Sequence, residues 1–310
     1  MGVEHGRGRG EGSDRGRGEG RDRGRGEKMA TKELKSLETG EPLRMASVGE
    51  VRCLKLTIAY DGTDYAGWQA QVESAKTTGG KPTIQQTLER AIERFCGESV
   101  RLLASGRTDA GVHALGQVVS LRTRSVQAAG YSPVVWLRAL NARLPRDIRV
   151  LRVDEAADSF HPTHDTRSKR YRYRIDNDAI RNVFQRRTHW FIPQPLDVTA
   201  MRTAAKFLVG THDFSSFESA GSPRSTSVRT IFDLSITHED RSEVRFEIEA
   251  DGFLYNMVRA ITGTLVQVGK GRWAPERVVE ILAAKNRSVA GPNAPPHGLC
   301  LLWVNYSKPT

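Results

Sequence analysis

The chain has 310 residues, enough for one large domain or two of ordinary size, each with its own core. It has no apolar run near the roughly 20 residues of a membrane span, no apolar secretory segment at its N-terminus, and no metal or disulfide pattern among its three cysteines. We therefore expect a cytoplasmic protein. The net charge is +11, of which residues 1–28 contribute only +2, with eight Lys or Arg against six Asp or Glu. This excess favours a polyanionic partner through counterion release, although it would also serve solubility.

The chain opens with a low-complexity segment, GRGRGEGSDRGRGEGRDRGRGE, which has no branched apolar or aromatic residue and cannot form a core. We expect residues 1–50 to be a disordered Gly/Arg-rich tail. Its RG repeats could contact RNA without sequence preference, but the interleaved Asp and Glu residues weaken that interpretation. No role is assigned to the tail.

The first regular elements are a strand and a helix. From Cys53 onward apolar and polar residues alternate, which predicts a strand with one buried face. After an insertion at about 72–82, to which no role is assigned, Thr83 and Gln86 form a capping box. Gly97 then ends a run of apolar residues at helical spacing. The sequence therefore predicts a helix between Thr83 and Gly97.

Strands and helices alternate through the rest of the chain. A second helix is predicted from Ser132-Pro133 to Pro145, with Leu137, Leu140 and Leu144 facing inward. Because strictly alternating strands have one wet face, we expect an α+β fold of two similar half-domains with mainly antiparallel sheets. Helices should pack on one side, and the other side should line a cleft. Further strands are predicted at 148–153, 170–175, 228–236, 243–250 and 299–305, and further helices at 197–209, about 254–268 and 275–285.

The segment GRTDAGVHALGQV, Gly106–Val118, concentrates polar residues between two apolar runs. Three interpretations of Asp109 are open: a carboxylate that caps a turn or helix, a metal ligand together with His113, or a nucleophile or base. Capping is the commonest role of Asp beside Gly, and a metal site would need further ligands that nothing nearby supplies. A nucleophilic carboxylate suits the breaking and remaking of a glycosidic bond.

Two later segments carry side chains that could serve a site. KRYRYRI, Lys169–Ile175, alternates tyrosines with arginines. It predicts either an ordinary strand with an aromatic core face and a solvated basic back, or a tyrosine that stacks on a nucleobase. DGFLYNMVRAITGTLVQVGKG, Asp251–Gly271, consists mostly of core residues at helical spacing. Arg259 within it needs an anion, and a carboxylate across the cleft would suit it.

Together with YDGTDYAGWQAQ and GTHDFSSF, these three segments resemble the tRNA pseudouridine synthase A family in motif and order, from about residue 53 to 306. The resemblance implies that Asp109 is the catalytic aspartate and that Arg107 shapes the base-flipping site. It also implies that Tyr171 packs on the target uracil and that Arg259 pairs with Asp109. The family organisation further implies a homodimer, in which each chain joins its two half-domains, 51–168 and 169–310, into one extended sheet around the cleft.

The expected function is isomerisation of uridine to pseudouridine on the 3′ side of the tRNA anticodon stem-loop, at positions 38–40 of tRNA in the family. An isomerisation requires no cofactor and no metal, and the sequence has no phosphate-binding loop, dinucleotide fingerprint or ligand cluster. The alternative is a non-catalytic RNA-binding or tRNA-chaperone module on the same scaffold. Asp109 distinguishes the two, because a binder has no use for an aspartate in a cationic pocket.

One position departs from the family pattern. Where the family commonly has Phe-x-Ala-Arg ahead of the tyrosine strand, this chain has Phe160-His161-Pro162-Thr163. The expected RNA-contacting arginine is therefore missing at Thr163. Either Arg167 or Lys169 replaces it, or the choice of target uridine differs.

Overall fold

A computed structural model of the chain describes residues 51–69, 80–126, 128, 130–221, 226–239 and 242–306. All of them belong to one compact unit, Met45–Thr310. The expected tail at residues 1–50 and most of the insertion at 72–82 lie outside the described residues. None of the helices in the described part of the chain has the length and hydrophobicity of a transmembrane span.

Before residue 156, both helices and the first and last strands begin and end close to where local patterns predict, whereas the second and third strands were not predicted. Thr83 caps the first helix, because its Oγ1 accepts a hydrogen bond from the Gln86 amide at 3.2 Å, and Gly97 ends it with a left-handed φ of 71°. In the second helix Leu137 is only partly buried, whereas Trp136 is fully buried. The strands are β1 (Arg52–Tyr60), β2 (Leu103–Ala104), β3 (His113–Thr123) and β4 (Ile148–Glu155), and the helices are α2 (Ile84–Cys96) and α3 (Pro133–Arg143).

The remaining elements include every strand and helix predicted for the later part of the chain. Asp197 caps its helix, since its carboxylate accepts a hydrogen bond from the Ala200 amide at 2.9 Å. The strands are β5 (Ser168–Asp176), β6 (Trp190–Phe191), β7 (Gly210–Asp213), β8 (Val228–Glu239), β9 (Glu243–Ala250) and β10 (Leu299–Asn305). The helices are α4 (Val198–Lys206), α5 (Met257–Gly269) and α6 (Arg277–Ala284), with short 3₁₀ turns at Ser215–Phe217, Arg287–Val289 and Pro296–Gly298.

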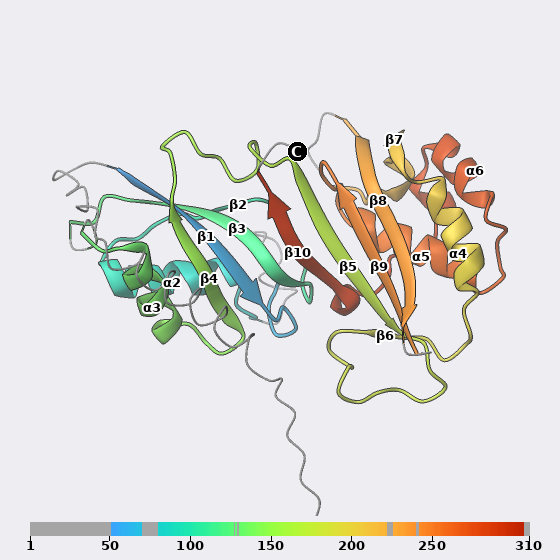
Figure 1. The fold of residues 1–310 in the computed structure, drawn as a ribbon, viewed down its shortest axis with the longest axis horizontal. Helices are drawn as coiled ribbons and strands as arrows, with labels where there is room; N and C mark the ends of the chain where they lie inside the picture. Colours follow the sequence, from blue (N-terminus) through green and yellow to red (C-terminus); the bar gives the residue numbers. More distant parts are fainter. Residues whose placement is uncertain are drawn as a thin grey trace, which may run out of the picture. The chain divides into compact units, whose positions relative to one another are not determined.

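The strands form one ten-stranded sheet with the order β4-β1-β3-β10-β5-β9-β8-β7, to which β2 and β6 add at the sides (Figure 1). Along this path only β3 and β10 are parallel, with Cys300 opposite His113 and Leu301 opposite Ala114. The mainly antiparallel α+β fold is thereby confirmed. The last strand, β10, joins the early strands to the later ones, and the half-domain boundary at 168/169 stays a prediction.

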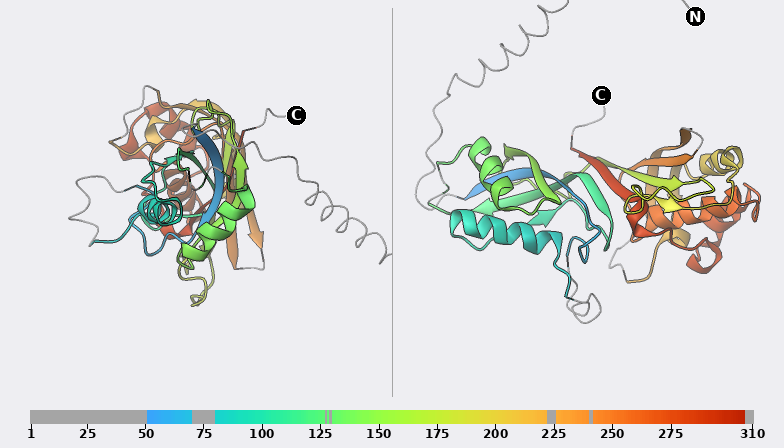
Figure 2. Two further views of the ribbon diagram at one scale, coloured as in Figure 1. Left: turned by 90° about the vertical axis from the view of Figure 1, so that its left-hand side faces the viewer. Right: turned by 90° about the horizontal axis from the view of Figure 1, so that it is seen from below.

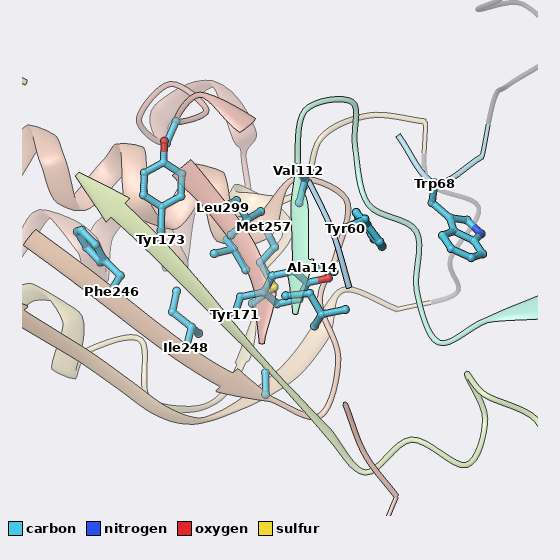
Figure 3. Packing of buried hydrophobic residues seen from close by; sticks show 14 of the residues in the cluster. Tyr60, Trp68, Val112, Ala114, Tyr171, Tyr173, Phe246, Ile248, Met257 and Leu299 are labelled. Atoms are coloured by element: carbon cyan, nitrogen blue, oxygen red, sulfur yellow. The ribbon is translucent and has the colours of Figure 1, made fainter. Parts of the chain in front are cut away.

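Helices α2 and α5 lie along the same side of this sheet (Figure 2, right). Helices α2 and α3 share one core, in which the Phe95 ring packs edge-on against Trp136 with centroids 4.9 Å apart. The central part of the core is drawn in Figure 3, where Tyr171 and Tyr173 of β5 lie beside buried residues of β9 and α5. Burial of these apolar faces supplies the main stabilisation of both ends of the sheet.

The arginines of β5 lie on the opposite face of the sheet from its tyrosines. One interpretation of the sequence expected this face to be basic and exposed to solvent. Instead, the arginines pair with carboxylates on neighbouring strands. Arg172 Nη2 lies 2.6 Å from Glu247 Oε1, and Arg170 Nη2 lies 2.9 Å from Glu249 Oε2. Cross-strand pairs of opposite charge stabilise neighbouring strands and hold their register.

Candidate active site

A cleft of about 750 Å³ lies between the loop that joins β2 to β3, strand β5 and the start of α5. Its lining includes all four residues singled out in the sequence, Arg107, Asp109, Tyr171 and Arg259. The cleft opens on the side of the sheet that carries α2 and α5, because Gln85 of α2 and Met257 of α5 also line it. The expectation that the bare side of the sheet would line the cleft was therefore wrong. The apolar face of β5 extends beyond the part that the helices cover, and there it lines the cleft.

The loop carrying Asp109 is held by contacts with the end of β1 and the turn after it. The Trp68 amide donates to the Thr108 carbonyl at 2.9 Å, and the hydroxyls of Tyr60 and Thr108 are hydrogen-bonded at 2.8 Å. Gly67 has a φ of 88°, and a Cβ atom there would lie 2.7 Å from the Thr108 carbonyl oxygen. Only glycine allows this close approach without strain. Asp109 is therefore presented from a fixed backbone.

Two buried polar side chains, Ser105 and Gln117, support this loop through hydrogen bonds. Ser105 Oγ donates to Gln117 Oε1 at 2.6 Å, and Gln117 Nε2 donates to the Gly106 carbonyl at 2.8 Å. Gln117 is fully buried, and it lies within β3, which begins at His113. The second half of the segment therefore belongs to a strand. Some of its polar residues belong to a buried hydrogen-bond network that supports the loop. The sequence did not lead us to predict that Thr108 and Gln117 are part of this network.

The structure brings Asp109 and Arg259 together. Arg259 Nη1 lies 3.0 Å from Asp109 Oδ2, and the two side chains are 16% and 28% exposed, respectively. Arg259 Nε also donates to the Ala294 carbonyl at 2.7 Å, and Nη1 donates to Asn256 Oδ1 at 2.7 Å. Among the described residues, the hydrogen-bond partner of the Asp109 carboxylate is this arginine, so the carboxylate does not act as a backbone cap.

His113 does not share a site with Asp109. Its Nδ1 accepts a hydrogen bond from the Gly62 amide at 3.2 Å, and its Nε2 lies 2.9 Å from the Arg187 carbonyl and 3.1 Å from the His297 carbonyl. The ring lines a different pocket, described below. Within the described ranges, no three His, Cys, Asp or Glu side chains are grouped so that they could hold a metal ion.

Of the two tyrosines in β5, Tyr171 is the one in the cleft. It is 9% exposed, and its ring meets Phe253 edge-on with centroids 5.0 Å apart. Tyr173 is fully buried, and its hydroxyl donates to the Pro295 carbonyl at 2.7 Å. Burial, together with the nearby Tyr60 and Asp109, raises the pKa of the Tyr171 phenol well above its ordinary value. Its hydroxyl therefore stays protonated at neutral pH and can donate a hydrogen bond.

Basic side chains lie around the mouth of the cleft. Arg107 is exposed and makes no hydrogen bond or ion pair with another residue in the described part of the chain. Lys169 lines the cleft, and its Nζ donates to the Ser105 carbonyl at 2.5 Å. Thr163 also lines the cleft, whereas Arg167 is not among the lining residues. Of the two proposed replacements for the missing arginine, Lys169 is the one placed to contact a bound molecule.

A family model described as tRNA pseudouridine synthase matches residues 56–165 and 204–307. This match, on a fold with a partly buried carboxylate in a cationic cleft, places the chain among the pseudouridine synthases, which isomerise uridine. The tRNA pseudouridine synthase A of Moorella thermoacetica is 47% identical over 255 residues, covering 82% of this chain and 99% of that protein. That of Acetivibrio thermocellus is 44% identical over 256 residues, covering 83% and 100%. The chain belongs to the tRNA pseudouridine synthase A family.

Solved structures show a more distant similarity. A crystal structure of a Cbf5-Nop10-Gar1 complex matches with a TM-score of 0.35 and 9% identity, covering 85% of this chain and 51% of that one. The similarity is too low to extend the description of the site.

Proposed function

We propose that the protein isomerises uridine to pseudouridine at positions 38–40 on the 3′ side of the tRNA anticodon stem-loop, with Asp109 as the catalytic residue. The observation that supports this most directly is the Asp109–Arg259 pair, which lies in a cleft that Tyr171 and Arg107 also line. Membership of the family supports the reaction and the substrate class. The position within tRNA is the expectation drawn from the sequence motifs.

In this proposal each of these residues of the cleft has its own role in binding the nucleotide or in the reaction. A uridine must leave the helical stack to reach a partly buried carboxylate, which costs a few kcal/mol. Tyr171 offsets part of this cost by packing on the uracil, and its protonated hydroxyl supplies a hydrogen bond. The exposed Arg107 stabilises the flipped nucleotide through its phosphate or base.

The Asp109 carboxylate then acts on the nucleotide as a nucleophile or base, and Arg259 holds it in position. The C1′–N1 bond breaks, the uracil turns, and a C1′–C5 bond forms while C5 loses its proton to N1 of the base or to solvent. Every bond is exchanged within one nucleotide, so no electrons enter or leave. The reaction therefore requires no redox cofactor, nucleoside triphosphate or metal.

A module that only bound RNA would have no use for this arrangement. A carboxylate at the bottom of a cleft that faces phosphates opposes RNA binding through like-charge repulsion. Its retention beside Arg259 favours the catalytic interpretation over the RNA-chaperone alternative.

Chemical mapping of pseudouridine in tRNA incubated with the protein tests the proposal directly. We expect new pseudouridine at one or more of positions 38–40 and at no other uridine. A transcript with cytidine at these three positions is the matched control and should remain unmodified. Modification confined to another arm of the tRNA would contradict the proposed target, and no modification of any tRNA would contradict the activity.

We further propose that the protein works as a homodimer. The segment joining β5 to β6 exposes apolar side chains, among them Ile180 at 81% and Phe184 at 91%. Thr188, at the end of this segment, lines a pocket of about 420 Å³ on the face of the sheet that carries the β5 arginines. A protruding apolar segment and an adjacent pocket can pair reciprocally in a two-fold dimer, because each subunit offers both. The pocket combines apolar side chains with arginines: Leu115, Cys300 and Leu302 with Arg146, Arg149, Arg172 and Arg174.

The substitution Phe184→Glu should convert this dimer to a monomer, because it places a carboxylate where an apolar ring is expected to be buried. Sedimentation equilibrium at micromolar concentration measures the mass of both proteins. Thr203→Glu, on the exposed side of α4, adds the same single negative charge and is the matched control, which should leave the mass unchanged. A wild-type monomer, or a Phe184→Glu protein that remains dimeric, would contradict the proposed interface.

We also propose that the protein acts in the cytoplasm. Cys53, Cys96 and Cys300 are all free thiols, which is typical of a reducing compartment.

A further inference from the structure

Asn256, which directly precedes helix α5, has an unusual backbone conformation. Its φ is 61°, and among the described residues only one other non-glycine residue, Lys285, has a positive φ. A residue in this position usually has an extended backbone and a side chain that caps the helix. The Asn256 side chain caps no helical amide. Its amide group is therefore available for other contacts.

Those contacts connect Asn256 to the Asp109–Arg259 pair. Asn256 Oδ1 accepts a hydrogen bond from Arg259 Nη1 at 2.7 Å, and the same nitrogen contacts Asp109 Oδ2 at 3.0 Å. On its other side, Asn256 Nδ2 donates to Ser219 Oγ at 3.0 Å. Ser219 is itself fixed, because its amide donates to the Tyr255 carbonyl at 3.0 Å. A continuous hydrogen-bonded chain therefore runs from Ser219 through Asn256 and Arg259 to Asp109.

The orientation of the guanidinium depends on this chain. Arg259 has three acceptors on three different segments, namely the Ala294 carbonyl, Asn256 Oδ1 and Asp109 Oδ2. With only the Ala294 and Asp109 contacts, the planar group could rotate about its Nε end and draw the carboxylate with it. The acceptor on Asn256 supplies the third point that fixes the plane. A displacement of about 1 Å at a reacting group can lower a rate on the order of a hundredfold.

We infer that Asn256 is a positioning residue that holds Arg259, and through it the Asp109 carboxylate, in the reactive orientation. This inference rests on the proposed function of Asp109. Asparagine suits the position because it tolerates a left-handed backbone better than other side-chain-bearing residues and carries both an acceptor for Arg259 and a donor for Ser219. The strained position is thus explained by the site it supports.

Replacement by glycine tests the inference, because glycine accepts a φ of 61° without strain and removes only the side chain. We expect Asn256→Gly to lower kcat roughly 10- to 100-fold while KM for tRNA stays within about twofold, since the contact is made to Arg259 and not to the substrate. The thermal midpoint should stay close to that of the wild type. Lys285→Gly is the matched control, because it changes the other described left-handed residue, at the end of α6 and outside the cleft.

A double-mutant cycle with Arg259→Lys separates positioning from a merely structural role. Lysine cannot reproduce the planar fork, so Asn256→Gly should cost no more than about a further threefold in that background. Additive losses, an unchanged kcat for Asn256→Gly, or an equal loss for Lys285→Gly would each overturn the inference. Failure of the proposed function is distinguishable, because an active Asp109→Asn protein or an inactive wild type would show it without reference to Asn256.

Discussion

Asp109→Asn should abolish pseudouridine formation while leaving the fold and the affinity for tRNA close to those of the wild type. Asparagine is nearly isosteric with aspartate but is neither a nucleophile nor a base of comparable strength, so the first step of the reaction is lost. Its amide oxygen can still accept a hydrogen bond from Arg259, which preserves the contact across the cleft. The measurement is tritium release from tRNA labelled at uridine C5, with binding measured separately.

Asp158→Asn provides the control for this variant, because Asp158 is exposed and does not line the cleft. It should release tritium at the wild-type rate. If Asp109→Asn retained even about a tenth of the wild-type rate, Asp109 could not be the catalytic residue, because removal of a nucleophile or base normally costs far more.

Substitutions of Arg259 should impair the reaction in the order Ala more than Lys. Arg259→Ala leaves the Asp109 carboxylate without a partner among the described residues, and we expect a loss of roughly 100- to 1,000-fold, typical of a missing electrostatic donor. Arg259→Lys keeps the positive charge but cannot contact Ala294, Asn256 and Asp109 at once, so its loss should be smaller, roughly 10- to 100-fold. Single-turnover rates at saturating enzyme measure both effects without the contribution of tRNA binding.

The control for these substitutions is Arg272→Ala, an exposed arginine just beyond α5 that does not line the cleft. Its single-turnover rate should match the wild type. Equal rates for all three variants, or a faster reaction for Ala than for Lys, would show that the Asp109–Arg259 pair supports packing and not the reaction.

Elements whose signals are local could be predicted from the sequence. Helix α2 begins and ends as predicted because Thr83 and Gly97 satisfy its terminal groups within a few residues. The alternation in β1, β5 and β9 predicted their buried faces, since the side-chain period of a strand is two. Short strands such as β2 and β7 were missed, because two to four residues carry no period and form only by pairing with a neighbouring strand.

The residues of the candidate site also divide into those that could be predicted from the sequence and those that could not. Asp109, Arg107, Tyr171 and Arg259 were found in the sequence because polar or aromatic groups stood where local structure did not require them, and because they matched family motifs. The supporting residues Gln117 and Asn256 were not found. An asparagine before a helix ordinarily indicates a cap, and only its left-handed backbone and its contact with Arg259 reveal another role.

The sequence by itself therefore determined most of the longer strands and helices and which side chains are chemically unusual. Only the tertiary structure decided where those side chains meet. Asp109 and Arg259 are 150 residues apart, and they come together because β10, the last strand, pairs with β3 on one side and β5 on the other. Such pairing depends on burial and hydrogen bonding between segments that are distant in the sequence. No local pattern determines which strand a given strand pairs with, or in which register.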